Sequence, residues 1–427
     1  MRRRSGHDWR GLALALIGLA GIVGLAGCGS SRQIAGDQIA GDQIAGDSLT
    51  IYASIPLHGA SSVSGMAVLS GERMALAAVG GRIGRYRIGL RALDDSTIVR
   101  GGWDPGQTSA NARLAVQNRT TIGYLGDLNS GASAVSIPLL NRAGIAQISP
   151  ASTAVGLTSG GVEASPGEPQ KYYPTGVRTF ARVVPNDAVQ AAAQVRLQLS
   201  AGCTKTFVVD DAEVDGQDTA ASFEAAAQSS ALKVAGTQSF EPGQSSYSSL
   251  AVAVASSGAD CVLISAITED NAAQVTDQIA KTLPHAMIFG SAGLAESSYS
   301  DPALGGLATA VDSRVLITVA TLDPRAYPPA GRRFFVSYAQ RYGAPQPYAI
   351  FGYEAMSLML DAIGRATDRG DQPARRSEVV SAIFHTRDRQ SVLGTYSIDR
   401  DGDTTLKRYG VYRVVRGQLR FLKAIET

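Results

Sequence analysis

The chain has 427 residues, of which 44% are apolar and 18% are charged, and its formal net charge is +2. This length exceeds the roughly 250–300 residues at which a single core stops growing, so two domains are expected. The near balance of charge gives no reason to expect a nucleic-acid partner.

The N-terminal residues form a basic head followed by an apolar run. The first ten residues contain four arginines and one acid, and residues 11–27 are uncharged and rich in Leu, Ile, Val, Ala and Gly. This arrangement is typical of an export signal, and the run is shorter than the about 20 apolar residues that a membrane span needs. Removing residues 1–27 takes away four of the 39 basic residues and one of the 37 acidic residues, which leaves a net charge of −1.

The apolar run ends in Leu25-Ala26-Gly27-Cys28, which resembles the lipobox of bacterial lipoproteins. The resemblance implies cleavage before Cys28, lipid attached to its thiol, and a position on the outer face of the cell membrane. The alternative is an ordinary secretory signal with a chance cysteine. No later apolar run reaches 18 residues, so no membrane span is predicted after Cys28.

Residues 33–47 repeat the sequence Gln-Ile-Ala-Gly-Asp three times. A five-residue period is too short for a solenoid repeat, and the Gly and Asp in every copy disfavour a helix or a strand. Residues 28–47 are therefore expected to be the lipidated cysteine and a flexible tether.

From residue 48 onward, short apolar runs alternate with stretches of helical spacing. Strands are expected at 49–54, 85–92, 121–125, 145–149, 206–210, 234–239, 261–265, 286–290, 395–398 and 409–415. Helices are expected at 67–79, 105–118, 133–142, 189–199, 219–229, 248–256, 271–281, 331–342, 348–368 and 377–384. Between the two halves, residues 157–176 are rich in Gly and Pro and predict a long loop. The alternation predicts two doubly wound, Rossmann-like α/β lobes, in which ligands bind beyond the carboxyl ends of the strands.

Several segments, in order, resemble one protein family. They include Trp103-Asp104-Pro105-Gly106-Gln107, the segment Ile-Gly-Tyr-Leu-Gly-Asp-Leu-Asn-Ser-Gly-Ala-Ser at 122–133, and Gly-Ile-Ala-Gln-Ile-Ser-Pro-Ala-Ser-Thr at 144–153. From about residue 49 to 415 the chain is similar to the branched-chain amino-acid (Leu/Ile/Val) binding proteins of ABC transporters, which have the type I periplasmic binding fold.

The resemblance implies two lobes joined by a hinge of three crossing strands, with ligand between the lobes. The crossings would fall near residues 184–187, 318–323 and 404–408. The first lobe would comprise residues 48–184 plus 322–405, and the second residues 187–318 plus 407–427.

The resemblance also implies a set of ligand contacts. Ser130 and Thr153 fall where the family's hydroxyls hold a ligand carboxylate, with Ala151 supplying backbone, although both hydroxyls could instead cap the helices that follow. Asp187 falls on the family's first acid for a ligand ammonium group.

Other positions depart from the family. Asp215 stands where an aromatic residue is usual, Ser64 lies near the position of the first-lobe aromatic, and the family's glutamate is missing near Ala292. A buried Asp215 would need a cation, a set of hydroxyls or solvent, and the alternative is a solvated loop acid. The aromatic pair at 172–173 and Tyr353 either line the cleft or, as we expect, pack within the lobe.

Cys203 and Cys261 each precede a predicted strand of the second lobe. Neighbouring strands would bring both thiols to the same end of the sheet, and outside the membrane oxidation is expected. We therefore predict a structural disulfide, with two separate buried thiols as the alternative. The histidines have no metal-ligand spacing, and no nucleophile elbow or phosphate-binding loop occurs, so no metal, cofactor or enzymatic activity is expected.

These features together predict a monomeric lipoprotein that binds a small polar solute, an amino acid or a related compound, and passes it to an ABC permease. A ligand sensor of the same fold that does not transport is the alternative. An extracellular hydrolase is a third hypothesis.

Overall fold

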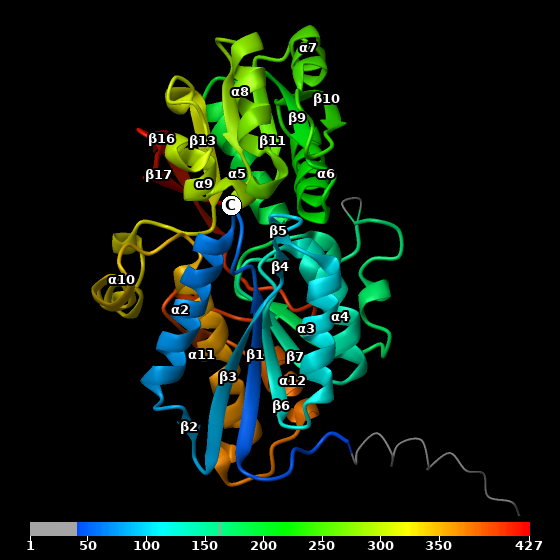
Figure 1. The fold of residues 1–427 in the computed structure, drawn as a ribbon, viewed down its shortest axis with the longest axis vertical. Helices are drawn as coiled ribbons and strands as arrows, with labels where there is room; N and C mark the ends of the chain where they lie inside the picture. Colours follow the sequence, from blue (N-terminus) through cyan, green and yellow to red (C-terminus); the bar gives the residue numbers. More distant parts are fainter. Residues whose placement is uncertain (1–40, 162–163) are drawn as a thin grey trace, which may run out of the picture. The chain divides into compact units, whose positions relative to one another are not determined.

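The computed structural model describes residues 41–161 and 164–427 (Figure 1). The predicted export signal and Cys28 lie outside these residues. Within the described part, strands gather into two large sheets, each with helices on both faces. We call the half of the molecule that carries the first sheet the first lobe and the other half the second lobe. The predicted fold class, two doubly wound α/β lobes, is confirmed.

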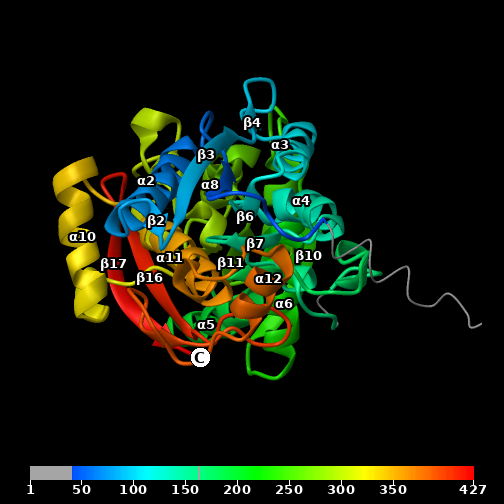
Figure 2. The same ribbon diagram turned by 90° about the horizontal axis from the view of Figure 1, so that it is seen from below.

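The first sheet has the strand order β2-β3-β1-β6-β7-β8, and all its strands are parallel except the short β2. These strands are β1 (Ser48–Ile55), β2 (Arg82–Ile83), β3 (Tyr86–Asp94), β6 (Thr121–Gly126), β7 (Ala146–Ser149) and β8 (Phe180–Arg182). The helices of this lobe are α2 (Ser62–Ala78), α3 (Pro105–Gln117), α4 (Ser130–Arg142), α11 (Ala349–Ala366) and α12 (Arg376–Phe384). Figure 2 shows the strands between α3 and α4 on one side and α11 and α12 on the other.

Alternating side chains of the first sheet supply its two cores. Tyr52 and Tyr124 point to the face covered by α3 and α4, where they pack with Ala112 and Leu140. Ile51, next to Tyr52, points to the opposite face and joins the core under α2 and α11. This two-sided burial explains why these strands are apolar on both faces.

The second sheet has the order β10-β9-β11-β12-β13-β16-β17. Its strands are parallel except β16, which runs antiparallel to both of its neighbours, β13 and β17. These strands are β9 (Lys205–Asp210), β10 (Lys233–Ser239), β11 (Cys261–Ser265), β12 (Met287–Gly290), β13 (Val315–Val319), β16 (Arg408–Val415) and β17 (Gln418–Glu426). The helices that follow or cover it are α5 (Asp187–Ser200), α6 (Val214–Gln228), α7 (Ser248–Ser256), α8 (Ala272–Thr282) and α9 (Ser297–Ser300). The helix α10 (Pro329–Tyr342) packs instead on α2 and α11 of the first lobe. Two short hairpins complete the set, namely β4 (Ser96–Thr97) with β5 (Gly102–Trp103) and β14 (Arg389–Gln390) with β15 (Thr395–Tyr396).

Most predicted elements are confirmed, but two strands of the second sheet were not predicted. β13 is a five-residue strand buried almost throughout, and β17 is an edge strand with little buried surface. An edge strand needs no continuous apolar run, so its sequence carries a weak signal. The start of α3 follows the prediction, because the Asp104 side chain accepts a hydrogen bond from the Gln107 amide.

The last copy of the Gln-Ile-Ala-Gly-Asp repeat does not extend as a free tether. Ile44 is only 4% exposed, and its amide donates to the Ala374 carbonyl. The Asp42 carboxylate accepts from the amide and the hydroxyl of Ser377. The expected tether boundary at residue 47 is therefore wrong, because contacts with the first turn of α12 and the segment before it hold the chain from Asp42, the end of the second copy, onward.

The chain passes between the lobes three times, after β8, after β13 and before β16. Two of these crossings are tied together at the hinge, because the Tyr409 hydroxyl donates to the Pro185 carbonyl over 2.9 Å.

In the second lobe, a disulfide joins Cys203 to Cys261, with an S–S distance of 2.03 Å. It links the start of β11 to the residue two positions before β9, its neighbour in the sheet. In the described part of the chain, no helix has both the length and the apolar content to cross a bilayer.

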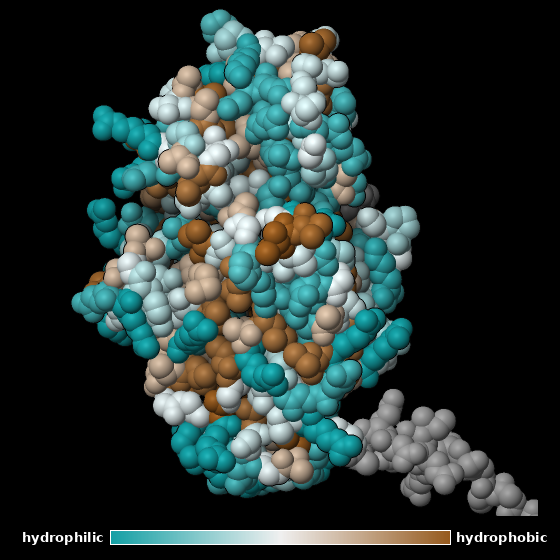
Figure 3. Space-filling view, viewed as in Figure 1, coloured by the Kyte–Doolittle hydropathy of each residue, from teal (hydrophilic) through white to brown (hydrophobic). Residues whose placement is uncertain are grey.

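The surface in Figure 3 carries an apolar patch over the loop between β4 and β5. The side chains that make it are Ile98 and Val99, which are 91% and 97% exposed.

Candidate functional site

Loops at the carboxyl ends of both sheets meet between the lobes and enclose a small cavity of about 30 Å³. The lining residues are Ser61, Leu128, Asn129, Ala151 and Thr153 from the first lobe, Asp215, Ile267, Ala292, Gly293 and Glu296 from the second lobe, and Tyr348 before α11. A cavity of this size holds about one water molecule. The lobes are therefore closed against each other, and a solute can enter only when they separate.

Three of the predicted site residues meet across the lobes. The Ser130 hydroxyl donates to Asp215 Oδ1 over 2.8 Å, and the Thr153 hydroxyl donates to the same oxygen over 3.0 Å. Ser130 Oγ also accepts from the amides of Thr153 and Ala154. The alternative that Ser130 caps α4 does not hold, because Asn129 is the N-cap residue and the Ser130 hydroxyl is used in these contacts.

Asp215 is thus not a solvated loop acid, and it forms no ion pair within residues 41–161 and 164–427. Its carboxylate accepts from two hydroxyls of the protein itself, so the expectation of sugar-like hydroxyls from a ligand stays a prediction. Burial between the lobes raises the pKa of its carboxyl, and the hydrogen bonds from Ser130 and Thr153 oppose this shift.

Asp218 was not predicted as a site residue. One of its carboxylate oxygens accepts from the Val155 amide over 2.7 Å and the other from the Gly156 amide over 3.2 Å. Burial raises its pKa to about 7. The signal for Asp218 was its spacing, since residues three apart share a helix face and Asp215 lies one turn earlier in α6.

Asp187 begins α5 and is fully buried. Its amide donates to the Thr153 carbonyl over 3.0 Å, which places it directly behind the cavity wall. Neither carboxylate oxygen has a hydrogen-bond partner among the described residues. Burial and the neighbouring charges of Asp215 and Asp218 raise its pKa well above the usual value.

A second group of acids lies on the side of the cavity nearest β1. The Ser61 hydroxyl donates to the Glu269 carboxylate across the lobes. Glu296 lines the cavity, and burial together with the charge of Glu269 raises its pKa to about 8. Ser64 is buried beside Glu296 in the first turn of α2. Ala292 lines the cavity where the family's glutamate was expected to be replaced, and Glu296, four residues further along, lines the cavity as well.

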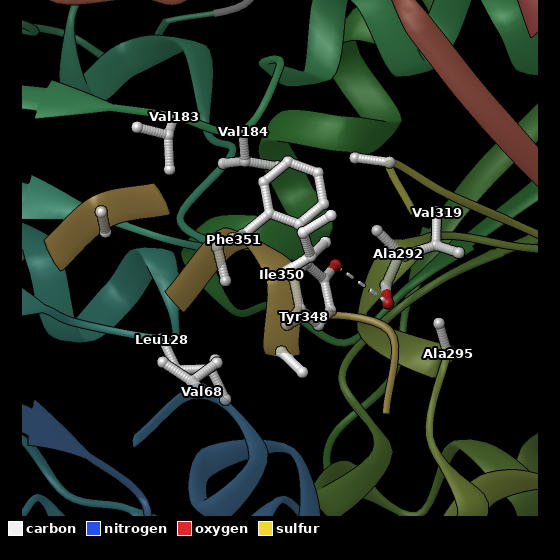
Figure 4. Packing of buried hydrophobic residues seen from close by; sticks show 14 of the residues in the cluster. Val68, Leu128, Val183, Val184, Ala292, Ala295, Val319, Tyr348, Ile350 and Phe351 are labelled. Atoms are coloured by element: carbon white, nitrogen blue, oxygen red, sulfur yellow. Dashed lines mark hydrogen bonds between the residues drawn. The ribbon is translucent and has the colours of Figure 1, made fainter. Parts of the chain in front are cut away.

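Tyr348 supplies an aromatic side chain that the sequence did not indicate. Figure 4 shows it among apolar residues at the start of α11, with a hydrogen bond to the Ala292 carbonyl over 3.5 Å. The aromatic residues considered from sequence pack elsewhere, as expected. Tyr172 and Tyr173 belong to a cluster with Phe180, and Tyr353 packs on Phe334.

Two further contacts define the site. The Ala151 amide, predicted to face a ligand, donates to Ser149 Oγ over 3.1 Å, although Ala151 still lines the cavity. Arg182 is the buried cation whose charge acts on both Asp187 and Asp215, where it opposes the rise in pKa.

This fold and this cavity define a two-lobed protein that binds a ligand between its lobes. A family model of periplasmic binding proteins matches residues 48–418. The chain therefore belongs to the periplasmic binding protein family, whose members bind ligands and are not enzymes. A search of curated proteins by sequence gave no match.

Solved structures show the same fold. The leucine-binding protein LivK of Thermotoga maritima is similar over 88% of this chain and 99% of its own, with a TM-score of 0.75 and 22% identity. The Streptococcus pneumoniae protein LivJ, in complex with isoleucine, is similar over 89% and 100%, with a TM-score of 0.70 and 16% identity. A solute-binding protein of an ABC transporter from R. palustris, in complex with benzoate, is similar over 88% and 96%, with a TM-score of 0.71 and 17% identity.

Proposed function

We propose that the protein is a lipid-anchored solute-binding protein that captures a small polar solute between its lobes and delivers it to an ABC importer. The observation that carries this proposal is the meeting of Ser130 and Thr153 with Asp215 across a cavity at the carboxyl ends of both sheets. Separation of the lobes breaks these contacts and exposes a set of polar groups to solvent. A bound solute bridges the lobes again, and the closed form is what the importer recognises.

The membrane anchor and the importer are proposed on two grounds. The sequence before Cys28 resembles a lipobox, and similar structures include proteins named as ABC transporter substrate-binding proteins, one of them bound to isoleucine. The lipid would keep a monomeric binding protein close to its permease on the outer face of the cell membrane.

Solute binding is tested with a form that starts at Gly29, unfolded and refolded to remove carried-over ligand. A thermal-shift screen covers amino acids, amides, amines, sugars and aromatic acids. At least one solute should raise the melting temperature, since a ligand that binds only the folded state stabilises it. Ser130→Ala should reduce the shift, whereas Ser249→Ala, on an exposed surface of α7, should not. A folded protein that responds to no solute would contradict the proposal.

Anchoring and delivery are tested in the native host. The wild type should fractionate with membranes and carry lipid on Cys28, and Cys28→Ser should be found outside the membrane fraction. Uptake of the radiolabelled solute should fall when the gene is deleted and return with the wild type. Unchanged uptake in the deletion strain would favour the sensor alternative.

A further inference from the structure

We infer that the solute is an organic cation without a carboxylate, a diamine or longer polyamine whose protonated amines lie between two groups of acids in the cleft. This inference rests on the proposed function, solute binding between the lobes. We call Asp187, Asp215 and Asp218 the aspartate group and Glu269 with Glu296 the glutamate group.

The donors that would hold a ligand carboxylate are already used by the protein. Ser130 and Thr153 both donate to the Asp215 carboxylate, and the next amides of the same loop, on Val155 and Gly156, donate to Asp218. A solute carboxylate at this place would have to displace one acid of the second lobe and lie against its charge. Like charges in a site with little water repel strongly, so an amino acid or an aromatic acid is disfavoured here.

Among the described residues, no cation forms an ion pair with these acids, and Arg182 acts on the aspartate group only through the field of its charge. Arg182 is buried nearby, but its Nε donates to Asp403 and its Nη1 donates to the Ser152 and Ala154 carbonyls. Its donors are therefore directed to the hinge and to the loop backbone and not into the cavity. Arg100 lies 3.4 Å from Glu213, outside both groups.

Unpartnered oxygens point to missing donors. Both carboxylate oxygens of Asp187 and Oε1 of Glu269 are buried without a hydrogen-bond partner in the part of the chain that the structure describes. A buried acceptor without a partner costs free energy, and a protonated amine brings both positive charge and several N–H donors. The Asp187 amide donates to the carbonyl of Thr153, which lines the cavity, so Asp187 lies directly behind the cavity wall.

One acid of each group lines the same cavity, and the other acids lie behind its wall. Asp215 and Glu296 both line the cavity, and so does Tyr348, whose pKa is raised by burial and by the charges of these two acids. The aspartate group is held by the loops after β6 and β7, whereas the glutamate group contacts Ser61 after β1. A solute with an amine at each end can neutralise both groups at once, and the electron-rich face of Tyr348 suits a cation between them.

The experiment uses two pairs of probes that differ only by a carboxylate, 1,4-diaminobutane with ornithine and 1,5-diaminopentane with lysine. Binding to the refolded form that starts at Gly29 is measured by titration calorimetry. We expect each diamine to bind at least about tenfold more tightly than its amino acid, and more tightly than n-butylamine, which has one amine. Glu296→Gln should weaken diamine binding, whereas Glu241→Gln, an exposed acid of the same lobe, should not.

A second variant should reduce the preference for a diamine over its amino acid. Asp215→Ala releases the hydroxyls of Ser130 and Thr153, so affinity for ornithine should rise relative to that for 1,4-diaminobutane. Binding of leucine, ornithine or benzoate by the wild type, with no binding of diamines, would overturn this inference and leave the proposed function standing. If neither the diamines nor any solute of the wider screen bound to folded protein, both would be overturned.

Discussion

Arg182 and Asp403 form a buried ion pair, in which Nε lies 2.6 Å from Oδ1. The same carboxylate accepts from the Asn186 amide group over 2.8 Å, so it joins the end of β8 to two of the crossings between the lobes. Arg182 Nη1 in turn donates hydrogen bonds to the carbonyls of Ser152 and Ala154. The hinge and the loop that carries Thr153 are thereby fixed to one buried cation.

Removing this cation should destabilise the protein strongly. Arg182→Gln leaves the buried Asp403 carboxylate without its partner, and breaking a buried pair from one side costs about 3–5 kcal/mol. Urea denaturation measures the loss in the free energy of unfolding. The matched control is Arg325→Gln, since Arg325 is 92% exposed beside Asp323 and such pairs contribute about 0–1 kcal/mol. Equal losses in the two variants would contradict the structural role of Arg182.

Glu72 should make stability fall as pH rises. It is fully buried in α2, and burial raises its pKa to about 8 from an ordinary value of 4.5. Between these two values the folded protein holds a proton that the unfolded chain has lost. The stabilisation is therefore complete below pH 4.5 and is lost as pH rises through 8.

The variant Glu72→Gln isolates this effect. From pH 5 to pH 8, it should lose about 3 kcal/mol less unfolding free energy than the wild type. Urea denaturation at both pH values measures the difference, and Glu378→Gln, on the exposed side of α12, controls for the loss of one carboxylate. A pH dependence identical to that of the wild type would exclude a buried, protonated Glu72.

The disulfide between Cys203 and Cys261 closes a loop with a sequence separation of 58 residues. In the chain-entropy model a loop of this length contributes about 4 kcal/mol. The double variant Cys203→Ser with Cys261→Ser should lose stability of this order, and a reducing agent should then have no further effect on it. Non-reduced peptide mapping of the wild type should show the two cysteines in one cross-linked species. Two unmodified thiols there would contradict the bond.

Ile44 should anchor the N-terminal segment to the first lobe. Ile44→Ala removes a side chain from the core cluster and should lower the free energy of unfolding by about 2 kcal/mol or more. The control is Ile98→Ala in the exposed loop between β4 and β5, which should change it by less than about 0.5 kcal/mol. If both variants matched the wild type, the segment from Asp42 onward would be a tether after all.

Much of the fold was predictable because it depends on local patterns. The apolar runs of β1, β6, β9 and β11 are buried on both faces, so their sequence alone indicates central parallel strands. The same apolar runs place Cys203 and Cys261 at or just before the beginnings of neighbouring strands. The export signal and the resemblance around Cys28 also depend on sequence alone, and they stay predictions.

The tether boundary and the site contents could not be predicted in this way. The last copy of the repeat, residues 43–47, is fixed by the contact of the Ile44 amide with the Ala374 carbonyl, more than 300 positions later in the chain. A local pattern contains no information about such partners.

The sequence by itself determined the order of strands and helices, the two lobes and the loops in which ligand contacts must lie. Only the tertiary structure decided which side chains those loops contact in the cavity. Asp215 meets Ser130 and Thr153 from 85 and 62 residues away, and Glu296 and Tyr348 enter the same cavity from elements that the sequence did not connect with it. The physical reason is that a side chain's partner depends on how two lobes close on each other, whereas sequence periodicity reports only which face of one element is buried.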